Sequence, residues 1–197
     1  MSLTRAFIAL EIPNQIHQEI STITAKLRQD IGTNPVRWVP PGNIHLTLKF
    51  LGNISSANID QISQVLSKVA GRYEKHTIII SGLGAFPNIR RPRVIWIGIQ
   101  APETLKALFR GLEDAMTNLE FPREKRSFNP HLTLGRVRQH LSPADSQSLQ
   151  KALSNTNIGY IDKVEVEALH LFKSDLKSSG AVYTKLYSAP LKNPSTR

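Results

Sequence analysis

The sequence predicts an α+β protein of two pseudo-symmetric lobes, and three observations support this fold class. Segments with strand periodicity alternate with amphipathic helices along the chain. Their order in the first half recurs, with one additional strand, in the second half. The tetrapeptide His-Leu-Thr-Leu occurs once in each half, at 45–48 and 131–134. We therefore expect one two-lobed domain over residues 1–197. Each lobe is an antiparallel sheet with helices on its outer face, and the sheets face each other across a central cleft.

Apolar periodicity and turn residues define the elements of the first half. Isoleucine and leucine at helical spacing predict a helix over 14–31 that ends at Gly32, and a second helix over 57–70 that ends at Gly71. The expected strands span 5–10, 44–51 and 77–83.

The second half repeats this order and adds one strand. A helix over 102–119 begins with proline, and a shorter helix covers 143–153. Residues 190–197 are rich in proline and polar residues, so we expect a flexible tail. The expected strands span 94–99, 131–137, 164–172 and 181–188.

The composition is that of a soluble globular protein, with 40% hydrophobic and 20% charged residues among 197. The absence of cysteine excludes a disulfide scaffold, a thiol nucleophile and a thiolate metal site, and it fits a cytoplasmic location. The early apolar run at 6–10 is too short for a signal peptide or a membrane helix, so we expect no membrane contact. A monomer is expected.

Basic residues exceed acidic ones by 25 to 15, which gives a net charge of +10. Such an excess favours a polyanionic partner, most often nucleic acid, although a merely solvated basic surface is the alternative. Arginines concentrate in two stretches, at 90–93 and at 123–138. Neither stretch alternates with aromatic residues, so both resemble the rim of an anion site more than a base-stacking platform.

The repeated tetrapeptide is the strongest functional signal. Roughly 0.005 additional copies are expected by chance from this composition, so a duplicated unit explains the repeat better. Strand alternation places His45 and Thr47 on one face and the two leucines on the other, and the same holds for His131 and Thr133. If the halves pack about a pseudo-two-fold axis, two imidazoles and two hydroxyls converge on one ligand.

This constellation suits phosphodiester cleavage. A neutral imidazole can take a proton from a nucleophile while a protonated one gives a proton to the leaving oxygen. Threonine hydroxyls and the nearby Arg136 can bind the non-bridging phosphate oxygens. Arg126, Arg136 and Arg138 should bias His131 toward its neutral form, whereas His45 has only Lys49 close by.

Two other interpretations of the histidines remain open. They could be structural, or they could bind zinc, which usually requires a third protein ligand. No carboxylate lies within five residues of either motif. The remaining histidines are interpreted as surface or loop residues; they are His17, His76, His140 and His170.

With these motifs the chain resembles the two-histidine (HxTx) phosphoesterase superfamily, and most closely the RNA 2′,3′-cyclic phosphodiesterases, also called 2′-5′ RNA ligases. The resemblance spans about residues 4–188. Besides both HxTx motifs, it rests on RAFIA at 5–9, RWV at 37–39, FLG at 50–52, GAFP at 84–87, RVIW at 93–96, FNP at 128–130 and GAVY at 180–183.

The resemblance implies hydrolysis of RNA 2′,3′-cyclic phosphate ends to 2′-phosphates, together with reversible 2′-5′ joining, and no metal or other cofactor. It makes His45 the proton donor and His131 the proton acceptor, with Thr47, Thr133 and Arg136 on the phosphate. Two alternatives remain open. The protein could be a module that binds RNA ends without turnover, or an enzyme that acts on small cyclic phosphates or 2′-5′ oligonucleotides.

Two expectations depend on details of strand geometry. Arg136 has the parity of the core-facing leucines, so it reaches the cleft only if a bulge, for which Gly135 is suited, reverses the alternation. Phe7 shares parity with Arg5 and Ala9 and is a candidate for stacking a base in the cleft, with a core position as the alternative.

Overall fold

The structure is a computed structural model that describes residues 3–32, 35–178 and 180–194. Its strands are β1 (Thr4–Leu10), β2 (Val36–Trp38), β3 (Leu46–Ile54), β4 (His76–Phe86), β5 (Val94–Gln100), β6 (His131–Val137), β7 (Tyr160–Val166), β8 (Ala168–Lys177) and β9 (Gly180–Pro190). Its helices are α1 (Asn14–Ile31), the 3₁₀ turn η1 (Pro41–Asn43), α2 (Ser56–Ala70), α3 (Glu103–Thr117) and α4 (Pro143–Asn155).

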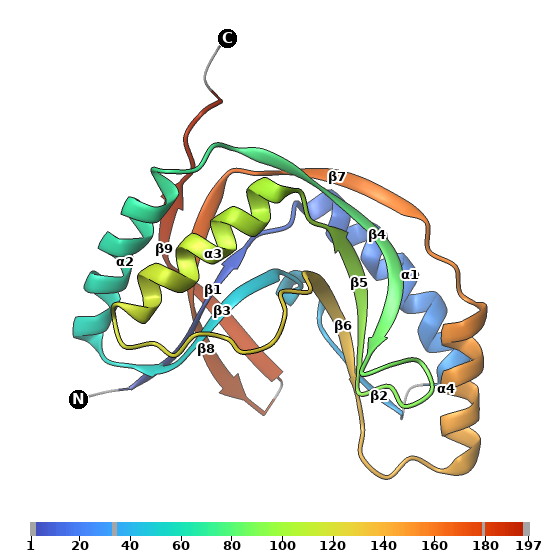
Figure 1. Ribbon diagram of the computed structural model, residues 1–197. Coiled ribbons are helices and arrows are strands. Elements are labelled where there is room, and N and C mark those ends of the chain that lie inside the picture. Colours follow the sequence, from blue (N-terminus) through green and yellow to red (C-terminus); the bar gives the residue numbers. More distant parts are fainter. Residues whose placement is uncertain (1–2, 33–34, 179, 195–197) are drawn as a thin grey trace.

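The strands form two antiparallel sheets, which confirms the predicted fold class. Sheet A has the order β3-β1-β8-β9, and sheet B has the order β2-β6-β5-β4-β7. The two sheets form the arms of an arch (Figure 1), with the helices on the outside. The buried apolar residues form one contiguous cluster to which both sheets and all four α-helices contribute.

The helices are exchanged between the halves of the sequence. Helix α2 packs beside α3 against sheet A, whereas α1 packs beside α4 against sheet B (Figure 1). Each pair therefore combines one helix from each half, and sheet A itself combines β1 and β3 with β8 and β9. The two lobes of the fold therefore do not correspond to the two halves of the sequence. Amphipathic periodicity shows which face of a helix is buried, but not which sheet covers it.

Two strand assignments also differ from the sequence-based expectation. The segment 164–172 is two strands, because the chain leaves sheet B after β7 and enters sheet A at β8, with only Glu167 between them. The three-residue strand β2 was not expected, since prolines at 35 and 40 flank it closely. Apolar and polar residues continue to alternate across Glu167, so the sequence does not show that β7 ends there. Strand β2 has only three residues, which is too few for alternation to be recognised.

The expected flexible tail is anchored in its first part. Leu191 is buried, and the backbone N–H of Lys192 donates to the carbonyl of Tyr73 over 2.9 Å. Residues 195–197 lie outside the described residues.

Candidate active site

The two motif copies lie on neighbouring strands of different sheets. His45 directly precedes β3 of sheet A, and His131 begins β6 of sheet B. These strands come into contact at the centre of the arch (Figure 1). The fold therefore brings the two tetrapeptides to the seam between the sheets.

Strand register places the His-x-Thr side chains on the cleft faces. On β6, His131 and Thr133 pair with Gly98 and Trp96 of β5, while Leu132 pairs with the buried Ile97. On β3, Thr47 pairs with Ala9 of β1. Paired residues of antiparallel strands share a face, so the leucines of both motifs lie on the core side.

The fourth residue of each tetrapeptide is a β-bulge. Leu134 has no partner between the pairs Thr133–Trp96 and Gly135–Ile95, and Leu48 is skipped in the same way between Thr47 and Lys49. The extra residue reverses the alternation. Arg136 consequently pairs with Val94, lies on the face of His131 and Thr133, and is exposed. The expected bulge thus exists, with Leu134 instead of Gly135 as the extra residue.

Both imidazoles are held by the same backbone contact. Nδ1–H of His45 donates to the carbonyl oxygen of Asn43, and Nδ1–H of His131 donates to that of Asn129, each over 2.7 Å. A carbonyl oxygen only accepts, so Nδ1 carries the proton and Nε2 remains for a ligand. The repeat thus extends to Asn-x-His-Leu-Thr-Leu, which the sequence shows and the tetrapeptide comparison missed. The Asn43 side chain also donates to the carbonyl of Ala181 over 2.7 Å, which fixes η1 to β9.

Aromatic rings enclose both histidines. The ring of His45 stacks on Phe7 at a centroid distance of 4.7 Å and meets the edge of Tyr183 at 5.3 Å. The ring of His131 meets Phe86 edge-on at 4.9 Å, with Trp96 at 6.3 Å. These contacts fix the ring planes and exclude water from one side of each imidazole.

Burial lowers the pKa of both histidines. For His45, desolvation is the main cause, the bond to Asn43 opposes it, and the charge of His17 lowers the pKa further. For His131, desolvation again lowers the pKa most, against the bond to Asn129, and Arg136 lowers it further. The expected bias of His131 toward the neutral form is therefore present, but burial contributes more than charge and acts on His45 as well.

The remaining predicted ligands of the phosphate differ in availability. Thr47 and Thr133 are half-buried, and within the described part of the chain neither hydroxyl has a protein hydrogen-bond partner. Both hydroxyls can therefore bind a ligand. Phe7, by contrast, is only 3% exposed. Its ring faces are occupied by His45 and Phe172, so it supports His45 and offers no free face to a base.

Lys49 does not act on His45 as the sequence suggested. After the bulge at Leu48 it lies on the core face, 5% exposed, where its Nζ donates to Glu113 Oε1 over 2.8 Å. Glu113, 2% exposed on α3, also accepts the backbone N–H of Glu124 over 2.8 Å. This buried ion pair ties the first motif strand to α3 and the following loop. No pattern in the sequence predicts this pair, because the two partners are 64 residues apart in the chain.

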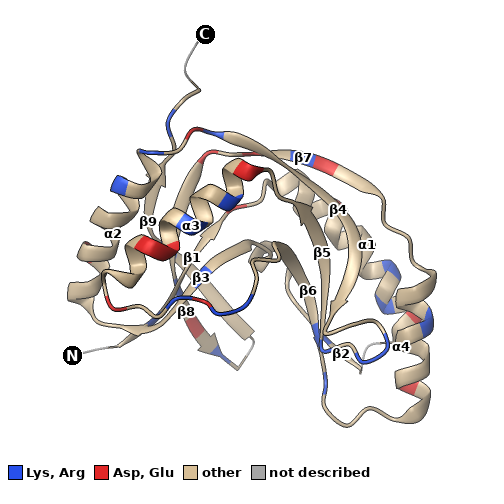
Figure 2. Ribbon diagram, viewed as in Figure 1, with Lys and Arg blue, Asp and Glu red and all other residues tan. Residues whose placement is uncertain are grey.

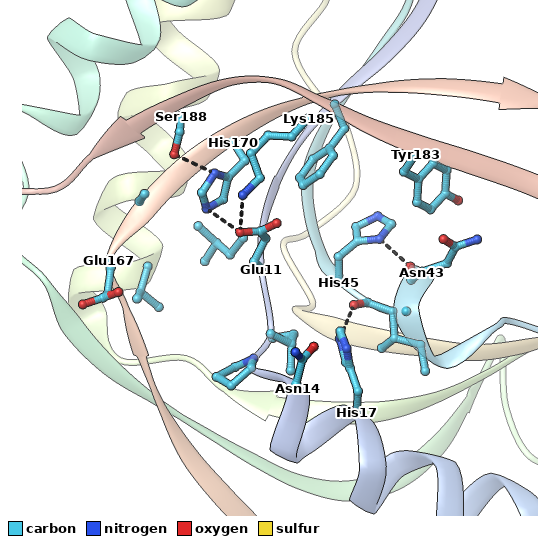
Figure 3. A pocket seen from close by; sticks show the side chains of 18 of the residues that line it. Glu11, Asn14, His17, Asn43, His45, Glu167, His170, Tyr183, Lys185 and Ser188 are labelled. Atoms are coloured by element: carbon cyan, nitrogen blue, oxygen red, sulfur yellow. Dashed lines mark hydrogen bonds and ion pairs between the residues drawn. The ribbon is translucent and has the colours of Figure 1, made fainter.

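A cavity of about 850 Å³ adjoins His45 between the sheets (Figure 3). It contains His170, 8% exposed on β8, whose Nε2 lies 3.4 Å from Glu11 Oε2 and whose Nδ1 lies 2.9 Å from Ser188 Oγ. His17 of α1 lines the same cavity, with its Nε2 3.0 Å from the carbonyl oxygen of Ile44. Both histidines therefore line the cavity beside His45 and neither lies in a loop; His170 is buried, so its interpretation as a surface residue is wrong, whereas His17 is half-buried on α1.

Across the described ranges, no group of three or more His, Asp or Glu side chains is placed to hold a metal ion. None of the helices in that part of the chain combines the length and apolar character that crossing a bilayer requires.

A paired His-x-Thr motif on two facing sheets is the arrangement of two-histidine phosphoesterases. The sequence pattern of LigT-like phosphoesterases matches residues 10–96 and again residues 97–183, and the chain belongs to this family. It is 33% identical to an RNA 2′,3′-cyclic phosphodiesterase of Methanothermobacter thermautotrophicus, covering 92% of this chain and 96% of that protein. A second such phosphodiesterase, from Archaeoglobus fulgidus, is 32% identical over 92% of this chain and 97% of its own.

Solved structures show the same fold. TT0787 of Thermus thermophilus superposes with a TM-score of 0.79 at 26% identity, covering 97% of this chain and all of that one. E. coli LigT complexed with NADP⁺ superposes with a TM-score of 0.78 at 25% identity, covering 98% of this chain and all of that one.

Proposed function

We propose that this protein hydrolyses 2′,3′-cyclic phosphate ends of RNA to 2′-phosphates, with His45 and His131 as the acid–base pair. The observation that carries the proposal is the pair of matching Nδ1 contacts, which leave Nε2 of both rings available for proton transfer. The names of the relatives support the choice of substrate.

In the proposed reaction, water attacks phosphorus while Nε2 of neutral His131 takes its proton. The bond between phosphorus and the ribose O3′ breaks, and His45 gives its Nε2 proton to that oxygen. The product is a 2′-phosphate with a free 3′-hydroxyl, and proton exchange with solvent restores the two histidines. With an RNA 5′-hydroxyl in place of water as the nucleophile, the same two proton transfers join RNA ends through a 2′-5′ linkage, and the reverse reaction cleaves that linkage to the cyclic phosphate and the 5′-hydroxyl.

Thr47, Thr133 and Arg136 bind the non-bridging phosphate oxygens in this proposal. Both hydroxyls are without protein partners, and Arg136 lies on the cleft face and close enough to lower the pKa of His131. The guanidinium group of Arg136 can bind two of these oxygens at once and thereby stabilise the negative charge that develops on them in the transition state.

The lowered pKa values favour the neutral form of both histidines in the free protein. That state suits His131 as the base. His45 must bind a proton to act as the acid, and the negative charge of the bound phosphate raises its pKa. Substrate binding and proton uptake by His45 are therefore coupled in this proposal.

We further propose that the reaction needs no metal, since the two imidazoles supply both proton transfers and the described residues contain no group of three or more side chains placed to hold a metal ion. We place the protein in the cytoplasm as a monomer, in keeping with its lack of cysteine. Full activity after exhaustive chelation is the expected result. Loss of activity with EDTA and its return with zinc or manganese would contradict this part.

The main experiment incubates purified protein with an RNA that ends in a 2′,3′-cyclic phosphate. The expected product carries a 2′-phosphate, which resists enzymes specific for 3′-phosphates. A 3′-phosphate product would reverse the assignment of the leaving oxygen. Binding without turnover would leave the protein as an RNA-end-binding module.

A second candidate is an enzyme for small cyclic nucleotides, because the cavity beside His45 is about 850 Å³ and can enclose a nucleotide. Comparing a mononucleoside 2′,3′-cyclic phosphate with the RNA substrate separates the two. Turnover of the mononucleoside but not of RNA would favour this candidate.

A further inference from the structure

Two arginines lie side by side on the cleft face of sheet B. Arg37, on the edge strand β2, pairs directly with Arg136 of β6, so both side chains project from the same face. Directly paired residues on antiparallel strands have their Cβ atoms about 5 Å apart, and like charges in such a pair repel. Both side chains are exposed.

Within the part of the chain that the structure describes, no acidic side chain pairs with either arginine to offset this repulsion. Residues 35–38, 86–93 and 131–141 surround the pair and contain no Asp or Glu. Cations elsewhere do have partners: Arg123 pairs with Asp114, and Lys185 with Glu11. Among the described residues, no ion pair involves any arginine of the exposed group at this edge, which comprises Arg37, Arg90, Arg91, Arg93, Arg136 and Arg138. Figure 2 shows the same edge, at β2 and the end of β6, in blue without red.

The local structure holds Arg37 in this position. Val36 of β2 is buried and Trp38 is half-buried, so Arg37 is the exposed side chain of the strand. Gly135 lets β2 approach β6, since a Cβ there would lie 2.6 Å from Cγ1 of Val36. The carbonyl of Arg93 accepts the N–H of Val137 over 2.9 Å, which fixes a third arginine beside the pair.

We propose that Arg37 binds the RNA backbone phosphate on the 5′ side of the terminal nucleoside, next to the reacting phosphate held by Arg136. This inference rests on the proposed function and deepens it, because it assigns a binding residue to the phosphate that links the terminal nucleoside to the rest of the RNA. With one phosphate bound to each guanidinium group, the negative charges offset the repulsion between the two arginines, and each phosphate accepts charge-assisted hydrogen bonds.

The test uses two probes that differ by one group: a nucleoside 2′,3′-cyclic phosphate, and the same compound with a 5′-phosphate. The wild-type protein should have a kcat/KM about 10- to 100-fold higher for the 5′-phosphorylated probe, which is the worth of one charged contact. In Arg37→Ala this preference should nearly disappear, mainly through a higher KM. Turnover of the unphosphorylated probe should fall less than about threefold, because only a neighbouring charge is lost. Arg37→Lys should retain part of the preference.

Arg72→Ala is the matched control, because Arg72 is an exposed arginine just beyond α2, on the opposite arm of the arch. It should leave the preference unchanged. A second readout is thermal stability without ligand, which Arg37→Ala should leave equal or slightly higher because a repulsion is removed.

The inference is overturned if the wild-type protein has the same kcat/KM for both probes, or if Arg37→Ala lowers kcat/KM by the same factor for both. Absence of turnover of either probe and of RNA by wild type would instead overturn the proposed function.

Discussion

The two copies of the motif differ just after the tetrapeptide that they share. In both, the fourth residue bulges out of register, so the next two positions are equivalent. The first copy has Lys49 buried against Glu113 and then Phe50, which is 65% exposed. The second has Gly135 beneath β2 and then Arg136 beside Arg37. The strand of the first copy is thus anchored in the core through Lys49, whereas the strand of the second copy places Arg136 beside Arg37 at the exposed edge of sheet B.

This difference shows how a duplicated unit becomes a polar active site. The shared residues place one imidazole and one hydroxyl on each sheet by the same backbone contacts. The unshared residues give the two imidazoles different neighbours, with Phe7 and Tyr183 around His45 and an arginine near His131. Two equivalent groups can therefore take opposite roles in one reaction.

The largest expected effect comes from removing either imidazole. His45→Ala and His131→Ala should each lower kcat on a cyclic-phosphate RNA by roughly 10²–10⁴, the usual worth of a general acid or base, with little change in substrate binding. His76 is a matched control: its Nδ1 bonds the carbonyl of Glu74 over 2.9 Å in the same local geometry, but at the start of β4, away from the motif strands. His76→Ala should retain activity. Near-normal turnover in either motif variant would show that its histidine is not catalytic.

The roles of the two histidines can be separated with a nitrophenyl phosphodiester, whose leaving group departs without a proton. On this substrate the kcat of His45→Ala should lie within about tenfold of the wild-type value, whereas the kcat of His131→Ala should remain strongly reduced. Steady-state kinetics on both substrates measures the difference. The opposite pattern would reverse the roles, and equal losses would mean that both imidazoles act chiefly by binding phosphate.

The buried anchor of the first copy should matter for stability. Glu113→Ala leaves the Lys49 ammonium buried without its partner, so unfolding free energy should fall by about 3–5 kcal/mol. Urea denaturation followed by circular dichroism measures this. Glu103→Ala, which breaks the exposed pair with Lys106, should cause no measurable change. Similar small effects in both variants would show that the buried pair contributes little.

The smallest expected effect is on pH dependence. Kinetics at low substrate concentration report the free protein, in which His45 must be protonated and its pKa lies below the ordinary value. The kcat/KM should therefore decline already as pH rises through the slightly acidic range. His17→Gln removes the charge interaction with His17 that lowers the pKa of His45, so the pKa of His45 should rise and this decline should move to higher pH. The exposed His140 provides the control, since His140→Gln should leave the profile unchanged.

The sequence by itself determined the fold class and predicted the residues of the candidate site. Alternation within His-Leu-Thr-Leu decided which side chains face the cleft, because a strand has a fixed period of two. Its duplication predicted two facing sheets, and the need of Arg136 for a bulge was readable from parity alone.

Only the tertiary structure decided where the halves exchange elements and which side chains meet. Four features depend on contacts between residues that are distant in the sequence. They are the packing of α1 and α2 against different sheets, the passage of the chain from one sheet to the other at Glu167, the Lys49–Glu113 ion pair and the Arg37–Arg136 strand pair. Local periodicity contains no information about such contacts, because it records only whether a side chain is buried. What buries Phe7 against His45, or leaves Phe50 exposed, depends on which strand the fold places alongside.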